Sequence, residues 1–206
     1  MRTTDALKQA DSIAGSRANA ATNVNLPNFL TVARILLIPV FVVLFSDPTP
    51  DRSLIAALIF IIAAVTDLLD GYLARRHSQV TRLGRLLDPI ADKLLVLSAL
   101  ILLVEFDRVH PVVAILIIAR EVAVTSVRGL AAPQGIIMEA ETMGKYKMAV
   151  QVVAIVFLLL ERGVLPDTWH AHDVGTVLLY LALALAFYSG NRYLMTFWQQ
   201  SSKKGL

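Results

Sequence analysis

The sequence contains no cysteine, so neither disulfide bonds nor thiolate metal ligands are possible. Its four histidines do not have the spacing of zinc ligands, which argues against a zinc site. Charged residues make up only 17% of the 206 residues, whereas 56% are hydrophobic and the mean hydropathy is +0.65. A soluble domain of this length would be less apolar. The composition therefore predicts a membrane protein in which any metal ion is bound by oxygen ligands.

Six apolar stretches follow one another along the chain, each close to the ~20 residues that a helix needs to cross a bilayer. They cover residues 29–46, 52–75, 86–105, 111–131, 143–161 and 173–198. No soluble domain fits between them, so we expect an all-α membrane protein in which residues 25–198 form one domain of six transmembrane helices. Residues 1–24 are polar and lack the apolar segment of a signal peptide. We expect them and residues 199–206 to be tails.

The basic residues are distributed unevenly between the two sides of these stretches. The segments 46–52, 105–111 and 161–173 hold only three of the 19 lysines and arginines. The other sixteen lie in the tails, in the remaining loops or near the helix ends. Because cytoplasmic segments carry the excess of positive charge, both termini and the 75–88 loop are predicted to be cytoplasmic.

Eight residues in or beside the second and third stretches have a distinctive spacing, D-x2-D-G-x2-A-R-x8-G-x3-D-x3-D. They are Asp67, Asp70, Gly71, Ala74, Arg75, Gly84, Asp88 and Asp92. The first four share one face of a helix, and the last three share one face of the next. If these helices are antiparallel neighbours, four carboxylates converge. Carboxylates near a bilayer need compensating charge, so two divalent ions, Mg²⁺ or Mn²⁺, are expected there with a pyrophosphate.

The other residues of this motif suit a phosphate ligand. Gly71, Ala74 and Gly84 have little or no side chain, which leaves room for a ligand close to the backbone. Arg75 adds a fixed cation whose geometry matches phosphate oxygens.

Some charges inside the apolar stretches are not explained by topology. The basic ones are Arg34, Arg120, Arg128, Lys145 and Lys147. Around one cavity they would form a second anion site, suited to an acceptor that carries a phosphate. Two of these residues have an alternative, structural role that remains open. Arg120 could pair with Glu121 for purely structural reasons. Arg34 could extend its charged group to the membrane surface, that is, snorkel.

The motif resembles the signature of the CDP-alcohol phosphatidyltransferases, and all eight positions match. The segments LPNFLTVARILLIPVFVV, LGRLLDPIADKLLV, IAREVAVTSVR and GKYKMAVQ are similar to the bacterial phosphatidylglycerophosphate synthase subgroup. The similarity covers roughly residues 25–150. Residues 1–24 are an addition relative to that subgroup and carry no family motif.

This resemblance implies a fold, a reaction and partners. The fold is a six-helix membrane domain, usually a homodimer, with a polar cavity open to the cytoplasmic side of the bacterial inner membrane. The substrates are CDP-diacylglycerol and, in this subgroup, glycerol 3-phosphate. The products are phosphatidylglycerophosphate and CMP. Membrane lipids are expected to surround the protein, and no nucleic-acid partner is expected.

The resemblance also implies roles for individual residues. Asp67, Asp70 and Asp88 anchor the two Mg²⁺ or Mn²⁺ ions, and Asp92 completes the second site and acts as general base. The residues expected to contact CDP-diacylglycerol are Asn28, Asp67, Asp70, Gly71, Ala74, Arg75 and Gly84. Those expected to hold the acceptor phosphate are Arg34, Arg120, Arg128, Lys145 and Lys147.

Other functions give different expectations. A sister enzyme would use another acceptor, such as inositol phosphate, serine or a second lipid. A divalent-cation transporter would carry its carboxylates near the bilayer midplane on broken helices, whereas these aspartates lie at helix ends. A non-catalytic scaffold would hold a structural metal. Release of CMP from CDP-diacylglycerol separates the enzymes from the other two classes.

Overall fold

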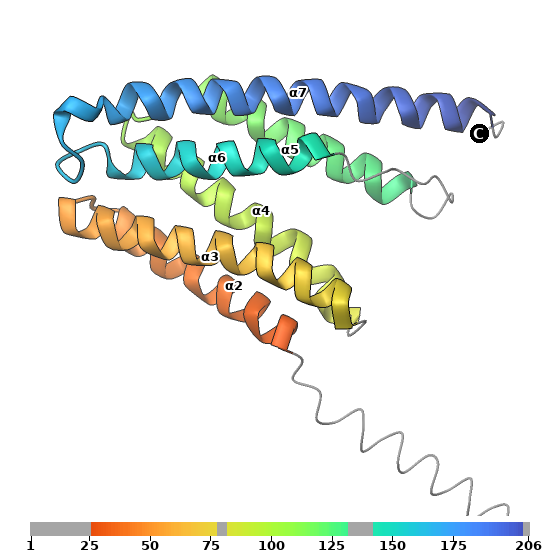
Figure 1. Cartoon of the computed structure of the whole chain (residues 1–206), viewed down its shortest axis with the longest axis horizontal. Helices are drawn as coiled ribbons and strands as arrows, with labels where there is room; N and C mark the ends of the chain where they lie inside the picture. The colour runs from red at the N-terminus through yellow and green to blue at the C-terminus, as the bar shows by residue number, and fades with distance from the viewer. Residues whose placement is uncertain (1–25, 78–81, 132–141, 204–206) are drawn as a thin grey trace, which may run out of the picture.

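The computed structural model describes residues 26–77, 82–131 and 142–203 (Figure 1). In these ranges the regular structure consists of six α-helices and one 3-10 turn, with no strand. The elements are α2 (Leu26–Phe45), α3 (Pro50–His77), α4 (Arg82–Glu105), α5 (Pro111–Ala131), α6 (Thr142–Leu160), η1 (Asp167–Trp169) and α7 (Ala171–Lys203). The all-helical class is thus confirmed for the described residues. α7 continues into the segment that was expected to be the C-terminal tail.

Local sequence explains where several helices begin and end. α3 and α5 each begin with a proline, which has no N–H to lose at the first helical position. α4 ends in a Schellman motif, in which Asp107 adopts the left-handed conformation with φ of 55°. There the Arg108 N–H donates to the Leu103 carbonyl at 2.8 Å, and the Asp107 N–H donates to the Val104 carbonyl at 3.1 Å. This turn leaves Arg108 buried between the helices.

Aromatic side chains join α2 and α3 to the end of α4. The Phe41 ring stacks on Phe45 with centroids 6.1 Å apart and contacts Phe60 at 6.0 Å. The Phe45 ring meets Phe106 edge-on at 5.7 Å. Phe41, Phe45 and Phe60 are completely buried, and such ring pairs stabilise a core beyond their buried area.

α6 and α7 approach each other closely because Gly175 has no side chain. A Cβ atom at this position would lie 2.7 Å from Leu158 Cγ and 3.2 Å from the Ala154 carbonyl oxygen. Leu158 and Ala154 are themselves fully buried. Gly175 therefore sets the spacing of the two helices near the start of α7.

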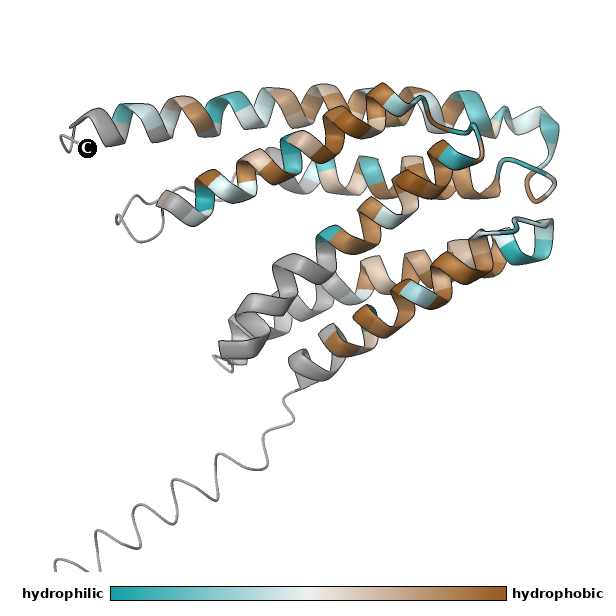
Figure 2. Cartoon of the chain, turned by 180° about the vertical axis from the view of Figure 1, so that it is seen from behind, coloured by the Kyte–Doolittle hydropathy of each residue, from teal (hydrophilic) through white to brown (hydrophobic). Residues whose placement is uncertain are grey.

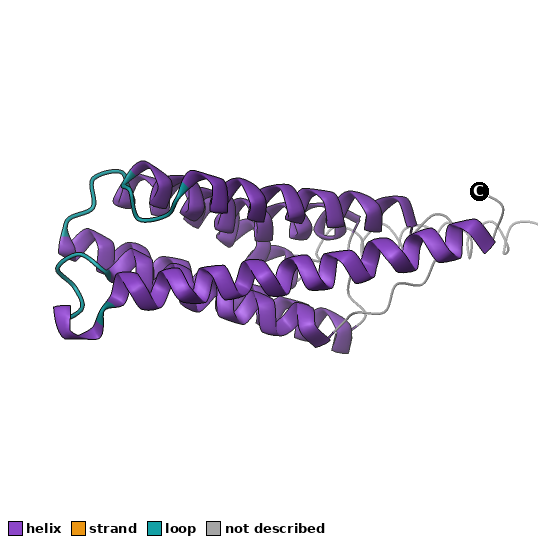
Figure 3. Ribbon diagram, turned by 90° about the horizontal axis from the view of Figure 1, so that it is seen from above, coloured by secondary structure: helices purple, strands orange, loops and turns teal. Residues whose placement is uncertain are grey.

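Consecutive helices run in opposite directions and give the molecule two distinct ends (Figures 1 and 3). The distal end contains the loops 46–49, 106–110 and 161–170. At the motif end, α3 and α5 finish and α4 and α6 begin. Towards the motif end, α2 and α3 lean away from α6 and α7, and α4 crosses between the two groups (Figure 1).

Hydrophobic residues recur along the described helices (Figure 2), and many of their large apolar side chains are exposed. Leu36 and Val43, for example, are 64% and 70% exposed. Among the described residues, Asp167–Thr196 is long and apolar enough to span a membrane by length and composition. Val32–Phe45 and Tyr146–Leu160 are shorter apolar helical segments. A helix that is apolar all round needs cover from lipid or from protein.

Candidate functional site

The predicted metal-binding motif lies on two helices that meet at the motif end. Asp67, Asp70, Gly71, Ala74 and Arg75 belong to the last turns of α3, and Gly84, Asp88 and Asp92 belong to the first turns of α4. The helical spacing on which the prediction depends is therefore present. α3 and α4 contact each other and run in opposite directions (Figure 1).

The side chains of the motif lie outside the described residues, as do those of Asn28 and Lys145. Their roles stay predictions. The donor set nevertheless fits the expected metal, because carboxylate oxygens are the ligands that Mg²⁺ and Mn²⁺ prefer. The polar cavity expected beside these residues also stays a prediction.

Glu121, on α5, is the centre of an ion-pair cluster that joins three helices. Its Oε1 accepts a hydrogen bond from Arg120 Nη1 at 2.8 Å and another from Lys147 Nζ on α6. Its Oε2 accepts one from Lys93 Nζ on α4 at 2.9 Å. The Glu121 side chain is only 13% exposed. We call Lys93, Arg120, Glu121 and Lys147 the Glu121 cluster.

This cluster brings together two of the residues predicted to hold the acceptor phosphate, Arg120 and Lys147. It adds Lys93, which follows Asp92 directly in α4. The sequence signal for Lys93 was a lone lysine beside an apolar run, which could not show its partner. Both oxygens of Glu121 are used, whereas lysine and arginine carry more N–H groups than one carboxylate can accept. Arg120 and Lys147 therefore have N–H groups that the Glu121 carboxylate does not use.

Arg120 also fastens α5 to α7. Its Nε donates to the Ala186 carbonyl at 2.8 Å, and its Nη2 contacts Ser189 Oγ at 3.4 Å. Gly190 lies beside the same guanidinium, since a Cβ there would be 3.5 Å from Arg120 Nε. The contribution of α7 was missed by sequence reasoning. The signal was present as the small polar pair Ser189 and Gly190 inside an apolar helix.

Two further residues that were predicted to bind the acceptor phosphate, Arg128 on α5 and Arg34 on α2, lie outside the Glu121 cluster. Arg128 is exposed in the last turn of α5, two turns beyond Arg120. Arg34 is 1% exposed, and its Nε donates to the Ala63 carbonyl of α3 at 3.3 Å. Because the Arg34 side chain is buried against α3, it does not snorkel to the surface. Its assignment to the acceptor phosphate, like that of Arg128, stays a prediction.

The distal end holds a second buried carboxylate with several basic partners. Glu161 is 5% exposed and lies 3.5 Å from Arg108 Nε, 3.5 Å from Arg162 Nε and 2.6 Å from His172 Nδ1. Arg108 Nη1 donates to the carbonyls of Leu158 and Leu159 at 2.9 Å, so it caps the C-terminal end of α6. Burial lowers the pKa of the Arg108 guanidinium, and the nearby Glu161 carboxylate opposes that shift.

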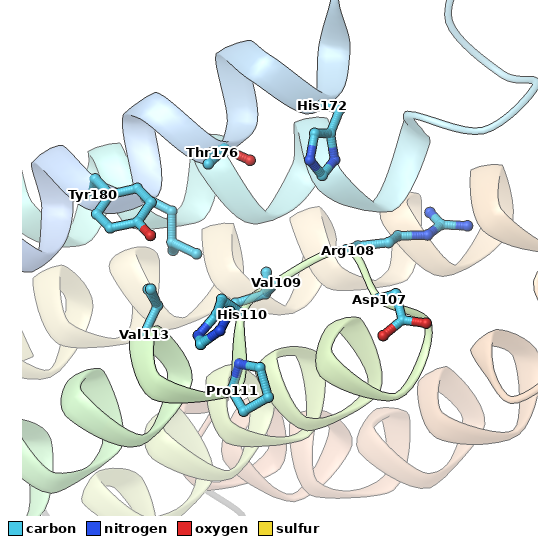
Figure 4. Close-up of a pocket in the computed structure, with 10 residues that line it drawn as sticks. Asp107, Arg108, Val109, His110, Pro111, Val113, His172, Thr176 and Tyr180 are labelled. Atoms are coloured by element: carbon cyan, nitrogen blue, oxygen red, sulfur yellow. The ribbon is translucent and has the colours of Figure 1, made fainter.

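A pocket of about 290 Å³ opens beside this second cluster (Figure 4). His110, His172, Thr176 and Tyr180 are among the residues that line it. It lies at the opposite end of the helices from the aspartate motif. No group of three or more metal-binding side chains occurs in the described part of the chain. Because its lining residues belong to the distal end, this pocket does not coincide with the site that the motif predicts.

Comparison with known proteins matches the sequence to a single family over most of its length. The model of the family described as CDP-alcohol phosphatidyltransferase matches residues 24–188. A Bacillus subtilis protein is 40% identical over 187 residues, which covers 85% of this chain and 96% of that relative. A Haemophilus influenzae protein is 39% identical over 178 residues, with 82% and 91% covered. A Rickettsia bellii protein is 38% identical over 170 residues, with 82% and 93% covered.

All three relatives carry the name CDP-diacylglycerol–glycerol-3-phosphate 3-phosphatidyltransferase. The matched region includes the complete aspartate motif on α3 and α4 and the complete Glu121 cluster. By its motif, its helical fold and this match, the chain belongs to the CDP-alcohol phosphatidyltransferase family.

Proposed function

We propose that this protein transfers the phosphatidyl group of CDP-diacylglycerol to glycerol 3-phosphate, which yields phosphatidylglycerophosphate and CMP. The observation that carries the proposal is the Glu121 cluster, which gathers basic side chains from α4, α5 and α6 at one buried point. A phosphorylated acceptor needs fixed cations of this kind, whereas an uncharged alcohol does not. The names of the relatives give the same reaction.

The aspartate motif supplies the other half of the site. Asp67, Asp70, Asp88 and Asp92 would hold two Mg²⁺ or Mn²⁺ ions, which when bound neutralise negative charge on the pyrophosphate and on the departing CMP. Gly71, Ala74 and Gly84 leave room for the nucleotide, with Asn28 beside it. Arg75 binds phosphate oxygens.

The transfer itself is a displacement at the β-phosphorus of CDP-diacylglycerol. Asp92 takes the proton from the acceptor hydroxyl, whose oxygen bonds to the β-phosphorus. The bond from that phosphorus to the bridging pyrophosphate oxygen breaks, and CMP leaves with this oxygen. Arg120 and Lys147, with Arg128, Lys145 and Arg34, hold the acceptor phosphate so that the hydroxyl is in line. The acyl chains remain in lipid.

The proposal includes a multi-pass position in a bacterial inner membrane, as a homodimer with both termini and the active site cytoplasmic. The uneven distribution of lysine and arginine supports this orientation. The many exposed apolar side chains of the helices, such as Leu36 and Val43, support contact with lipid. The helix lengths support it too, since α3 with 28 residues and α7 with 33 residues exceed the ~20 needed.

An acceptor panel tests the proposed reaction. Purified protein is given CDP-diacylglycerol with glycerol 3-phosphate, inositol phosphate or serine, and released CMP is measured with the lipid product. We expect glycerol 3-phosphate to be the preferred acceptor. The Asp67→Asn variant serves as the control. Loss of one metal-binding carboxylate should abolish CMP release. The variant should still fold, because repulsion among the remaining carboxylates falls. Release with inositol phosphate alone would assign a sister activity, and no release with any acceptor would contradict the enzyme class.

A further inference from the structure

The Glu121 cluster contains a residue that the proposed reaction does not use directly. Glu121 is an acid in a site whose expected ligand is an anion, so it would repel the acceptor phosphate if it touched it. It also lies within a helix that is otherwise largely apolar, where an unpaired carboxylate is costly. A functional account has to explain why an acid occupies the centre of this cluster.

The contacts of Glu121 give that explanation. Lys93, Arg120 and Lys147 come from three different helices and carry like charges, so without a central anion they would repel one another. Glu121 uses one oxygen for Arg120 and Lys147 and the other for Lys93. It therefore holds the three cations together before any substrate arrives.

The same contacts connect the two parts of the active site. The aspartate motif is carried by α3 and α4, whereas Arg120 and Lys147 are carried by α5 and α6. These helices lean apart towards the motif end (Figure 1). The Lys93–Glu121 ion pair connects α4 to α5 about midway along both helices. Lys93 is next in sequence to Asp92, the proposed general base.

Enough N–H groups remain for a substrate phosphate. Arg120 has five N–H donors, and its described contacts use one each on Nε, Nη1 and Nη2. Lys147 has three donors, and its described contact with Glu121 uses one. Arg120 and Lys147 therefore keep N–H groups for a phosphate while both still contact Glu121.

The geometry points to Glu121 as a positioning residue for the acceptor, acting through Lys93, Arg120 and Lys147 and fixing the acceptor phosphate relative to Asp92. Lys93 thereby joins the acceptor-binding residues. The inference rests on the proposed function. It predicts that removing the negative charge of Glu121 weakens binding of a phosphorylated acceptor, although the charge that is removed repels phosphate.

The variants Glu121→Gln and Glu121→Asp test this inference. In Glu121→Gln we expect the KM for glycerol 3-phosphate to rise on the order of 10- to 150-fold, as for loss of a charge-assisted interaction of about 1.5–3 kcal/mol. The Ki of inorganic phosphate, used as a competitor of glycerol 3-phosphate, should rise in parallel. The KM for CDP-diacylglycerol should change by less than about threefold. Glu121→Asp keeps the charge but shortens the side chain, so it should fold and show an intermediate KM.

Glu161→Gln is a matched control, because Glu161 is equally surrounded by basic side chains at the distal end. We expect it to lower the melting temperature in detergent and to leave both KM values unchanged. Lys93→Gln combined with Glu121→Gln should be no worse than the more severe single change, because the two residues act through one contact.

Two results would overturn the inference. Tighter phosphate binding in Glu121→Gln would show that Glu121 competes with the acceptor. Loss of thermal stability with both KM values unchanged, in Glu121→Gln and Glu121→Asp alike, would show that the cluster is only structural. If the wild-type protein uses another acceptor, the proposed function fails, but the inference can still be judged from direct binding of radiolabelled inorganic phosphate to wild type and Glu121→Gln. Equal binding would then refute it.

Discussion

Arg120 and Arg108 show how two buried arginines of one chain can differ in purpose. Both donate to helix carbonyls and both lie beside a glutamate. Arg108 contacts the C-terminal end of α6 and the Phe45 ring, whose centroid lies 5.0 Å from the guanidinium carbon. Arg120 shares its glutamate with two lysines about midway along α4 and α5. The Glu121 cluster sets three lysine and arginine side chains against one carboxylate, whereas Glu161 has two arginines and a histidine, and one of them, Arg162, is largely exposed.

We expect Arg120→Gln to raise the KM for glycerol 3-phosphate roughly 10- to 150-fold, because a charge-assisted phosphate contact contributes about 1.5–3 kcal/mol. The KM for CDP-diacylglycerol should stay nearly constant. Steady-state kinetics with each substrate varied in turn measures both values. The control is Arg108→Gln, which should reduce the melting temperature without a selective effect on either KM. Full rescue of Arg120→Gln by adding Glu121→Gln would place the acceptor site elsewhere.

Asp92 should matter more for turnover than for nucleotide binding, since its proposed role is to remove a proton. In Asp92→Asn we expect binding of CDP-diacylglycerol within about tenfold of wild type, equivalent to about 1.4 kcal/mol. Turnover should fall by a factor on the order of 10² or more. Binding and single-turnover CMP release are measured on the same preparation. If binding collapsed while turnover of bound substrate stayed normal, Asp92 would be a ligand and not the base.

At the scale of whole helices, α7 has two different relationships with its neighbours. Near its start it packs on α6, with Gly175 against Leu158 and Ala154. Nearer its end it meets α5, where Ala186 and Ser189 receive the Arg120 guanidinium. The first contact is apolar and close, whereas the second is polar and helps to hold a site residue. A change in α7 should therefore affect stability or acceptor binding according to its position.

Gly175→Ala should destabilise the protein, because the new Cβ would lie 2.7 Å from Leu158 Cγ and 3.2 Å from a backbone oxygen. Overpacking of this kind costs about 1–3 kcal/mol in general, so we expect a clearly lower melting temperature in detergent. Gly190→Ala is the control on the same helix, since its Cβ would meet nothing closer than 3.5 Å. A wild-type melting temperature for Gly175→Ala would mean that α6 and α7 are not so closely packed.

At the scale of the whole molecule, the two ends differ in composition and in proposed function. The motif end carries the aspartates of α3 and α4 and the cations of α5 and α6. The distal end carries short loops, the Glu161 cluster and the pocket of Figure 4. Because the helices alternate in direction, chemistry spread over residues 67–147 is brought to one end. The proposed reaction needs this end to face the cytoplasm, where CMP is released.

The absence of cysteine makes that orientation directly testable. Thr168→Cys places one thiol in the distal loop, and Gln79→Cys places one between α3 and α4. We expect a membrane-impermeant maleimide to label Thr168→Cys in intact cells. Gln79→Cys should be labelled only after the membrane is opened, because the positive charge around it keeps that segment cytoplasmic. The reverse pattern would invert the orientation and place the active site outside the cytoplasm.

The sequence by itself determined the helices and the placement of the aspartate motif along them. Apolar runs of about 20 residues, ended by proline and polar turns, are local properties, and they agree with α2–α7. The spacing from Asp67 to Ala74 and from Gly84 to Asp92 depends only on the helical repeat, so a common face for each set follows without a tertiary structure. The family resemblance added the reaction.

Only the tertiary structure decided which charges meet. Lys93 and Lys147 reach Glu121 from 28 and 26 residues away, and Arg120 reaches Ser189 across 69 residues. Such contacts depend on how each helix is rotated and tilted against its neighbours. The packing of apolar and small side chains determines this arrangement, whereas the periodicity of one segment does not. The sequence already placed Arg108 in a loop and Arg120 in the candidate site, but only the tertiary structure showed that Arg108 caps α6 and that Arg120 is held by Glu121 and α7.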